Sequence, residues 1–370
     1  MKIVYDHSAF NQRFGGVSRY YCELIKRLGL KGIELQVRVY ISRNIYVSSV
    51  RNLWIRIPAI KVRGLPRIEQ LVGDILLFFS LIFDRQIDIY HATHYSSFMF
   101  KLLPKKTKTI TTIHDMNEWV IPDFYPENSR RRVKQSLIMK KADALIAVSE
   151  NTRDDIISFF PEYRSKVFVA RHGVDKDFRS IATPVETKFA RFFLFVGARN
   201  SYKNFNVVVQ ALSLLDETLA GVGLVVAGEA FSASELAYLS DQGCLERVEN
   251  IVPTDESLMW LYQNAMLFVY PSFYEGFGLP LLEAMVSGCP VVASNVPVFK
   301  EVCQDAAVYF DPHDANQLAL AIEGLSSDEL MRKKLLKNGY RRLEDFTWEN
   351  CAEAHFKIYK DLLGSNGRSN

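Results

Sequence analysis

The sequence predicts an α/β protein with two doubly wound parallel sheets. Its 370 residues are too many for one ordinary core and suit two domains. Short apolar runs alternate with helical patterns along almost the whole chain, which is typical of parallel sheets with helices on both faces. The runs form two series of six, so we expect one sheet in each of two domains.

The expected strands and helices follow one another along both halves of the chain. The apolar runs that we expect to form strands are 2–5, 35–40, 87–92, 107–113, 142–148 and 166–170, then 192–197, 223–228, 248–252, 266–270, 290–294 and 306–310. The clearest helical patterns lie at 16–29, 129–141, 204–215, 255–264, 314–325 and 347–364.

A polar stretch with a proline, residues 175–189, separates the two series. We therefore expect an N-terminal domain at residues 1–180 and a C-terminal domain at residues 190–346. The pattern allows the last helix, residues 347–364, to pack back on the N-terminal domain. Two such domains facing one another would form a deep cleft, because ligands of doubly wound sheets bind outside the carboxyl ends of the strands.

Composition narrows the function classes. Lys and Arg number 45 against 42 Asp and Glu, a net charge of +3, which is too balanced for a dedicated nucleic-acid binder. The five cysteines are scattered without a CxxC pair, so we expect free thiols in a reducing cytosol and neither disulfides nor a metal site. The first residues, MKIVYDHSAF, indicate a strand and no signal peptide.

One apolar run, residues 75–83, has two open interpretations. It is far shorter than the roughly 20 residues that a spanning helix needs. It can be a core helix, or it can present a face that rests on a membrane or holds a lipid tail. Basic stretches at 101–108 and 130–141 fit an anionic lipid surface, and fit equally well solvated faces of a soluble protein.

Candidate binding residues follow the expected strands of the first half. Gly15 and Gly16 precede a helix, where backbone N–H groups can approach an anion, although the loop lacks the GxGxxG fingerprint and an ordinary flexible loop is the alternative. His114 follows the strand at 107–113. His91 and His94 have no HExxH-type spacing, so we do not expect them to bind a metal.

The second half places two cations after its first strand. Gly197, Arg199 and Lys203 follow the run at 192–197. Cations at the end of a strand suit a diphosphate, because they stabilise negative charge on a departing phosphate. A solvated basic loop is the alternative interpretation.

A tight turn lies between two acids in the stretch SFYEGFGLPLLEAM, residues 272–285. Gly276 and Gly278 permit the turn, and the proline two positions later suits the first turn of a helix. Glu275 precedes the turn, and Glu283 lies beside the apolar face of the helix, so both acids can point into one cleft. Carboxylates accept hydrogen bonds from sugar hydroxyls, so the stretch fits a ligand with a sugar, a phosphate and a ribose.

The stretch EGFGLPLLEA, with seven residues between Glu275 and Glu283, resembles the E-x7-E motif of retaining glycosyltransferases of group 1, the GT4 type, which have the GT-B fold of two Rossmann-like domains. The resemblance covers nearly the whole chain. Further segments that fall in the order of the family are GGVSRY, DIYHATH, TIHDM, ALIAVSENTRDDI, ARHGVD, VGARNSYKN and GCPVVASNVPVFKEV.

The resemblance implies a role for each matching residue. It places the amide of Gly16 and the cations on the donor diphosphate, Glu275 on the hydroxyls of the transferred sugar, and Glu283 on the ribose. The implied catalytic residues are His114, Arg199, Lys203 and Glu275, and the implied donor-binding residues are Gly15, Gly16, Gly197, Phe277, Gly278, Leu279 and Glu283. Arg199 fits less well, because many members have Arg directly after the glycine, where this chain has Ala198.

The implied function is a retaining, metal-free and cofactor-free hexosyltransferase. It would move a sugar from GDP-mannose or a UDP-sugar to a glycan or polyprenyl-linked acceptor in surface polysaccharide synthesis. We expect a cytoplasmic enzyme, with contact to the inner face of the membrane as a further expectation, and no nucleic-acid partner. A GT-B-fold epimerase or phosphorylase and a non-catalytic sugar-nucleotide-binding protein are the alternatives; the intact set His114, Lys203, Glu275 and Glu283 argues against the last.

Overall fold

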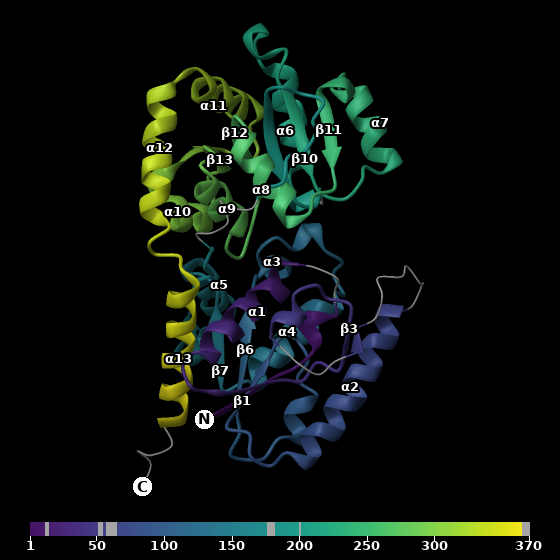
Figure 1. The fold of residues 1–370 in the computed structure, drawn as a ribbon, viewed down its shortest axis with the longest axis vertical. Coiled ribbons are helices and arrows are strands. Elements are labelled where there is room, and N and C mark those ends of the chain that lie inside the picture. The colour runs from purple at the N-terminus through teal and green to yellow at the C-terminus, as the bar shows by residue number, and fades with distance from the viewer. Residues whose placement is uncertain (12–14, 51–54, 57–64, 176–181, 200, 365–370) are drawn as a thin grey trace. The chain divides into compact units, whose positions relative to one another are not determined.

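Two units, each with its own parallel sheet, make up the chain. The computed structural model describes residues 1–11, 15–50, 55–56, 65–175, 182–199 and 201–364. The first unit contains Met1–Gly173 together with Trp348–Asn370, and the second contains Val174–Thr347 (Figure 1). Part of the expected boundary, residues 176–181, lies outside the described residues.

The first unit contains a six-stranded parallel sheet in the order β2-β1-β5-β6-β7-β8. Its strands are β1 (Lys2–Tyr5), β2 (Glu34–Val37), β5 (Ile89–Ala92), β6 (Lys108–Ile113), β7 (Ala144–Ala147) and β8 (Val167–Val169). Its α-helices are α1 (Gly16–Gly29), α2 (Leu65–Phe83), α3 (Asn117–Val120), α4 (Arg130–Lys141), α5 (Glu150–Phe159) and α13 (Trp348–Gly364). A short pair that the sequence pattern did not predict, β3 (Ile41–Ser42) and β4 (Ile55–Arg56), lies apart from this sheet.

The second unit contains a six-stranded parallel sheet in the order β11-β10-β9-β12-β13-β14. Its strands are β9 (Phe192–Val196), β10 (Gly223–Ala227), β11 (Val248–Ile251), β12 (Leu267–Tyr270), β13 (Val291–Ser294) and β14 (Ala307–Phe310). Its α-helices are α6 (Phe205–Leu214), α7 (Ala233–Asp241), α8 (Asp255–Asn264), α9 (Leu279–Ser287), α10 (Pro297–Cys303), α11 (Ala315–Ser327) and α12 (Glu329–Arg342).

The two-sheet α/β prediction is confirmed strand by strand. Each of the twelve expected runs overlaps a strand of one of the two sheets, and β2 begins one residue before its expected run and ends three before its end. The inner strands β5, β7, β12 and β13 are buried along their whole length. Strands covered on both faces have near-continuous apolar sequences, which is why the runs were visible in the sequence.

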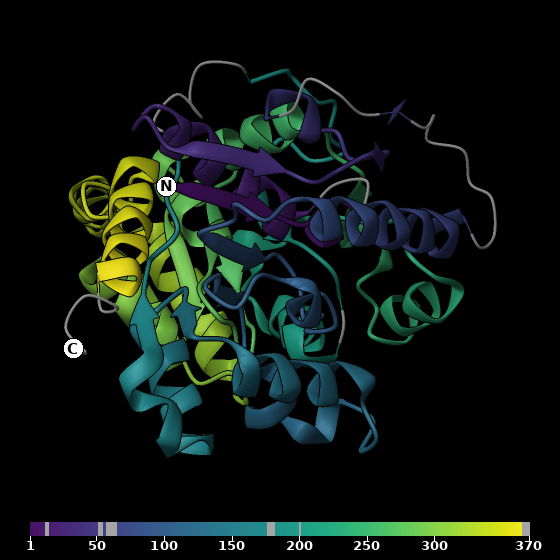
Figure 2. The ribbon, with the colours of Figure 1, turned by 90° about the horizontal axis from the view of Figure 1, so that it is seen from below.

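The last helix, α13, belongs to the core of the first unit. Trp348, Cys351, Ala352 and Tyr359 are buried in the same cluster as residues of β1 and α1. Their spacing of three, four and seven residues gives α13 one buried stripe. In the first unit, α13 and α2 lie on opposite sides of the sheet (Figures 1 and 2).

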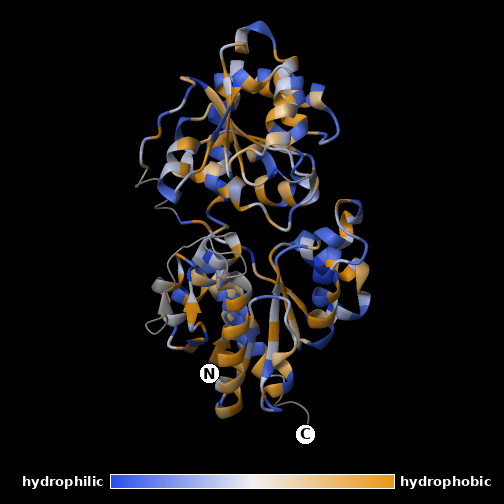
Figure 3. Ribbon diagram, turned by 90° about the vertical axis from the view of Figure 1, so that its right-hand side faces the viewer, coloured by the Kyte–Doolittle hydropathy of each residue, from blue (hydrophilic) through white to orange (hydrophobic). Residues whose placement is uncertain are grey.

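Helix α2 contains the apolar run at 75–83 and does not behave as a simple core helix. Leu77 and Leu81 are buried, and a Cβ at Gly73 would lie 2.5 Å from the His7 ring, so this face packs closely on the unit. Other apolar residues of the helix are exposed, among them Leu71 and Phe79, and Figure 3 shows this side of the unit. No helix of the described residues is long and apolar enough to cross a membrane.

Candidate active site

The second sheet places the predicted donor-site residues at its topological switch point. In the order β11-β10-β9-β12-β13-β14, the strands after β9 are added on one side of it as far as β11, and β12 then pairs on its other side. The switch point therefore lies between the neighbours β9 and β12. The loops after these two strands therefore meet at the carboxyl edge, where open α/β sheets bind ligands. Lys203 follows β9, and Glu275 follows β12.

Lys203 and Glu275 form an ion pair at this edge. The Nζ of Lys203 lies 2.5 Å from the Oε1 of Glu275, and the hydroxyl of Ser272 donates to the same oxygen at 2.8 Å. Nζ also lies over the ring of Tyr270, 5.7 Å from its centroid. Both charged side chains are mostly buried, with 17% and 13% of their surface exposed. The arrangement holds one cation and one carboxylate in fixed positions before any ligand binds.

Asn204 and the backbone hold the two loops together. The amide N–H of Phe273 donates to the carbonyl of Tyr202 at 2.9 Å. The side-chain amide of Asn204 donates to the carbonyls of Pro271 and Pro312, at 3.1 and 2.6 Å. Asn204 has a φ of +55°, a left-handed conformation that Asn tolerates better than most residues. Asn204 precedes α6 but its side chain makes no capping hydrogen bond to the helix, so its role as a link between loops was not predictable from a capping pattern.

The turn at the start of α9 requires its glycine. Gly278 has a φ of +113°, and a Cβ there would lie 2.9 Å from Cδ1 of Leu281. Leu279 opens the helix, followed by Pro280 in the first turn. Phe277 is buried, with its ring 5.7 Å from the ring of Phe346. The backbone of the predicted donor-binding residues is therefore set by local packing.

Glu283 lies on the edge of α9 and not in the core. It is half-buried between the fully buried neighbours Leu282 and Ala284. The hydroxyl of Tyr262, from α8, donates to its Oε2 at 3.4 Å. Glu275 thus precedes the glycine-containing turn and Glu283 lies in the second turn of α9; that both acids face one ligand stays a prediction.

Gly197 and Gly228 let two neighbouring loops approach closely. Gly197 has a φ of +121°, and its N–H donates to the carbonyl of Ala227 at 2.9 Å. A Cβ at Gly228 would lie 2.6 Å from the carbonyl oxygen of Gly197. The loops after β9 and β10 are in direct backbone contact for this reason.

Arg199 is engaged by the protein itself. Its guanidinium donates to both carboxylate oxygens of Glu235, at 2.6 and 3.3 Å, and to the carbonyls of Glu229 and Ala230 at 2.8 and 3.1 Å. It also stacks over Phe231, 4.6 Å from the ring centroid. The hydrogen bonds from Arg199 lower the pKa of Glu235 to about 2. In this structure Arg199 ties the loop after β9 to the loop after β10, and its role on a diphosphate stays a prediction.

His114 follows β6 in the first unit and carries no charge at neutral pH. Its Nε2 is enclosed and has no hydrogen-bond partner among the described residues. Its ring stands edge-on to Tyr20, with centroids 5.0 Å apart and an interplanar angle of 89°. Loss of solvation lowers the pKa of His114 to about 3, so the ring is a neutral donor or acceptor at pH 7.

Helix α13 reaches His114 through Tyr20. The hydroxyl of Tyr20 lies 2.8 Å from Nε2 of His355, whose Nδ1 lies 2.8 Å from the carbonyl of Cys351. Burial lowers the pKa of His355 to about 4. The contact between Tyr20 and His355 was not predicted, because the two residues are 335 positions apart in the sequence. No local pattern reports such a contact.

The other two histidines near strand ends, His91 and His94, lie beside tyrosine side chains of the first unit. His91 is buried, with Nδ1 2.7 Å from the hydroxyl of Tyr359 and Nε2 2.9 Å from the hydroxyl of Thr112. The ring of His94 lies beside Tyr95. Within the described part of the chain, no three or more His, Cys, Asp or Glu side chains are grouped to hold a metal ion.

Gly15 and Gly16 stand at the start of α1. Gly15 is the residue before the helix, and its carbonyl accepts hydrogen bonds from the hydroxyl of Ser18 at 2.9 Å and the N–H of Arg19 at 3.1 Å. Gly16 is exposed and opens this 14-residue helix. The preceding residues 12–14 lie outside the described residues.

Two of the cations in the basic stretch at 130–141 are used inside the first unit. Arg131 pairs with Asp115, which directly follows His114, at 2.6 Å. Arg132 stacks over Trp119, 4.3 Å from the ring centroid. Only part of this stretch is therefore available to a partner.

Two six-stranded parallel sheets, with a Lys–Glu pair on the loops at the switch point of the second, define an α/β protein with two doubly wound units. Two family models match consecutive parts of the chain: "Glycosyltransferase Family 4" at residues 14–178 and "Glycosyl transferases group 1" at residues 178–342. The chain belongs to the group 1 glycosyltransferases of the GT4 type and is a glycosyltransferase.

Curated relatives include O-antigen mannosyltransferases. The chain is 29% identical to O-antigen chain mannosyltransferase B of Escherichia coli over 395 residues, which cover 98% of this chain and 100% of the relative. It is 28% identical to O-antigen chain mannosyltransferase RfbU of Salmonella typhimurium over 228 residues, which cover 60% and 62% of the two chains.

Solved structures share the GT-B fold. Sucrose-phosphate synthase from Thermosynechococcus elongatus has a TM-score of 0.77 at 18% identity, covering 99% of this chain and 100% of that chain. HepE of Anabaena, solved with UDP and glucose, has a TM-score of 0.73 at 17% identity, covering 98% and 100%. At this identity the likeness shows the fold alone.

Proposed function

We propose that the chain is a retaining mannosyltransferase that uses GDP-mannose in the synthesis of an O-antigen-like surface polysaccharide. The observation that carries the proposal is the Lys203–Glu275 pair at the switch point of the second sheet. The names of the E. coli and Salmonella relatives support mannose as the sugar and a growing glycan, free or polyprenyl-linked, as the acceptor. A UDP-sugar donor is the second candidate, supported by the UDP bound in the structure of HepE.

The geometry supports a division of roles around the donor. Lys203 would contact the diphosphate and stabilise the charge that develops as the bond to the sugar breaks. Glu275 would accept hydrogen bonds from the sugar hydroxyls, and Glu283 from the ribose. His114 of the first unit, whose Nε2 has no hydrogen-bond partner among the described residues, would serve the transferred sugar on the ground of the family resemblance alone.

The reaction would proceed without a metal ion or another cofactor. The acceptor hydroxyl would attack the anomeric carbon from the face that the diphosphate leaves, so that the sugar keeps its anomeric configuration. We assign the donor to the second unit and the acceptor to the first, and we place the enzyme at the cytoplasmic face of the membrane.

The first experiment is a thermal-shift panel with UDP-, GDP-, ADP- and dTDP-sugars, because a ligand of the native state raises its apparent stability. We expect GDP-mannose to give the largest shift. The preferred donor is then incubated with a mannan or lipid-linked glycan, and the anomeric configuration of the product is determined by NMR. Release of the nucleoside diphosphate without a new glycosidic bond, or a product of inverted configuration, would contradict the proposal.

A further inference from the structure

Helix α2 presents an exposed apolar stripe on the first unit. Its most exposed apolar residues are Ile68, Leu71, Ile75, Phe79 and Phe83, and Phe83 is 82% exposed. Spacings of three and four residues place them along one side of the helix, and the fifteen steps from Ile68 to Phe83 span roughly 22 Å. This is a continuous patch, unlike the isolated surface hydrophobics that soluble proteins commonly have.

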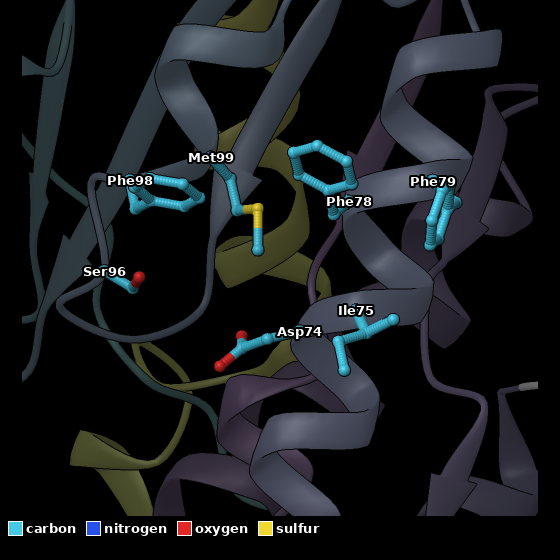
Figure 4. Close-up of a pocket in the computed structure, with 7 residues that line it drawn as sticks. All are labelled: Asp74, Ile75, Phe78, Phe79, Ser96, Phe98 and Met99. Atoms are coloured by element: carbon cyan, nitrogen blue, oxygen red, sulfur yellow. The ribbon is translucent and has the colours of Figure 1, made fainter.

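The stripe continues onto the loop after β5. A pocket of about 400 Å³ lies between α2 and this loop; it is lined by Asp74, Ile75, Phe78, Phe79, Ser96, Phe98 and Met99. Figure 4 shows Phe98 and Met99 on the side opposite α2, with Phe78 directed toward Met99. Phe98 is 58% exposed, so the apolar surface extends past the helix.

Exposed cations border this surface. Arg85 is exposed two residues after Phe83. Lys101 is exposed in the short helix η3 (Met99–Leu102), which packs beside α2. Lys141, at the end of α4, is exposed and reaches the hydroxyl of Ser97 at 3.3 Å, next to Phe98. The border is therefore positively charged at both the helix end and the loop.

The nearby acids do not cancel this charge. Asp84 is largely buried and paired with Lys2 and Arg38. Asp74 lies in the pocket with 38% of its side chain exposed, so its charge offsets that of one of the three cations. Glu69 is buried, 3.2 Å from Arg43. An apolar stripe with a net cationic border matches the interface of an anionic bilayer, whose headgroup phosphates would meet the cations while the aromatic rings enter the acyl region.

We propose that α2 and the loop at residues 96–99 form the surface by which this glycosyltransferase docks on an anionic lipid bilayer, with the helix axis in the plane of the interface. The inference rests on the proposed function only in that a lipid-linked acceptor gives the docking a purpose. A second copy of the chain is a poorer occupant, because a two-fold interface would enclose the three cations of each copy with only Asp74 of each to offset them.

The test is co-sedimentation of the purified full chain with liposomes of phosphatidylcholine alone or with one-third phosphatidylglycerol, at low and moderate salt. We expect binding to the anionic vesicles that weakens with salt. The double substitution Phe79→Ser/Phe83→Ser should lower the partition coefficient by about tenfold or more, since apolar burial is lost. Lys101→Glu and Lys141→Glu should each lower it by about fivefold or more at low salt.

The matched control is Leu320→Ser/Leu330→Ser, which removes two comparably exposed apolar side chains from the second unit. Its partition coefficient should equal that of the unchanged protein. Binding that ignores the α2 substitutions, or no binding to anionic vesicles, would overturn the inference. So would sedimentation equilibrium that shows a dimer which Phe79→Ser/Phe83→Ser dissociates. Vesicle binding needs neither donor nor acceptor, so its outcome is independent of whether the proposed transfer reaction occurs.

Discussion

The carboxyl edges of the two sheets each hold a carboxylate at the switch point, and they stabilise its charge in different ways. At the switch point of the second sheet, Glu275 is balanced by the charge of Lys203. At the equivalent place in the first sheet, between β1 and β5, the buried Asp6 accepts hydrogen bonds from the N–H groups of Ser8 and Thr93, at 2.9 and 3.2 Å. Asp6 is therefore satisfied by its own unit, whereas the second edge holds a paired cation that an anionic ligand can share.

The buried groups around His114 extend this contrast. His91, His114, His172 and His355 lie in the first unit, and burial lowers the pKa of each of them. Buried imidazoles remain neutral because desolvation disfavours the charged form, and buried charges persist only when they are paired. Around His114 the first unit therefore carries neutral imidazoles beside one charged pair, Arg131–Asp115, whereas the second edge carries the Lys203–Glu275 pair.

Lowering the pH should produce the largest difference in stability between the two units. These four histidines have folded pKa values below 6.5, so the unfolded state binds more protons as the pH falls from 6.5. Each of them should therefore lower the free energy of unfolding progressively as the pH falls from 6.5 towards its folded pKa. The low pKa of Glu235 in the second unit contributes stability that is lost only below about pH 4.5.

We therefore expect the first unit to unfold at higher pH than the second. Hydrogen exchange followed by mass spectrometry between pH 7 and pH 4 can assign the loss of protection to each unit. Simultaneous loss in both units, or earlier loss in the second, would contradict this prediction.

Removal of the cation at the second edge should have the next largest effect. Lys203→Ala should lower kcat by about 10²–10³-fold, the usual cost of a lost preorganised electrostatic group. Steady-state kinetics with the preferred donor measure it, and Lys300→Ala, an exposed cation on α10, is the matched control. A near-normal kcat in folded Lys203→Ala would place the stabilising charge elsewhere.

Glu283→Ala sharpens the assignment of the second acid. Loss of hydrogen bonds to a carboxylate costs roughly 1.5–3 kcal/mol, so the donor KM should rise about ten- to hundredfold with a smaller change in kcat. The exposed Glu329→Ala on α12 serves as control and should leave KM unchanged. If the donor KM of Glu283→Ala is also unchanged, Glu283 does not bind the donor.

Arg199 should give the smallest effect if it is a loop tie. Arg199→Ala and Glu235→Ala would then each destabilise the protein by about 1 kcal/mol, and the double variant would cost little more than either one. Urea unfolding of the four proteins measures this coupling. A kcat that falls a hundredfold in Arg199→Ala but not in Glu235→Ala would instead show that Arg199 leaves Glu235 to act on the diphosphate.

Much of the fold and of the second edge was determined by the sequence alone. Buried parallel strands have near-continuous apolar sequences, so the strands of the two sheets could be predicted from the apolar runs in the sequence. The turn at Gly278 and the spacing of Glu275 and Glu283 are local properties of one short segment. Such features depend on local backbone preferences, whereas their position at the edge of the sheet depends on the fold.

The contacts between distant segments are seen only in the three-dimensional structure. No sequence pattern indicates that Glu235 accepts hydrogen bonds from Arg199, 36 positions away, or that His355 lies against the hydroxyl of Tyr20. It also left open which side of α2 faces the core, because apolar residues occur around nearly the whole helix and no polar stripe distinguishes the sides. Periodicity reports which residues are apolar, but burial depends on which surfaces the rest of the chain covers.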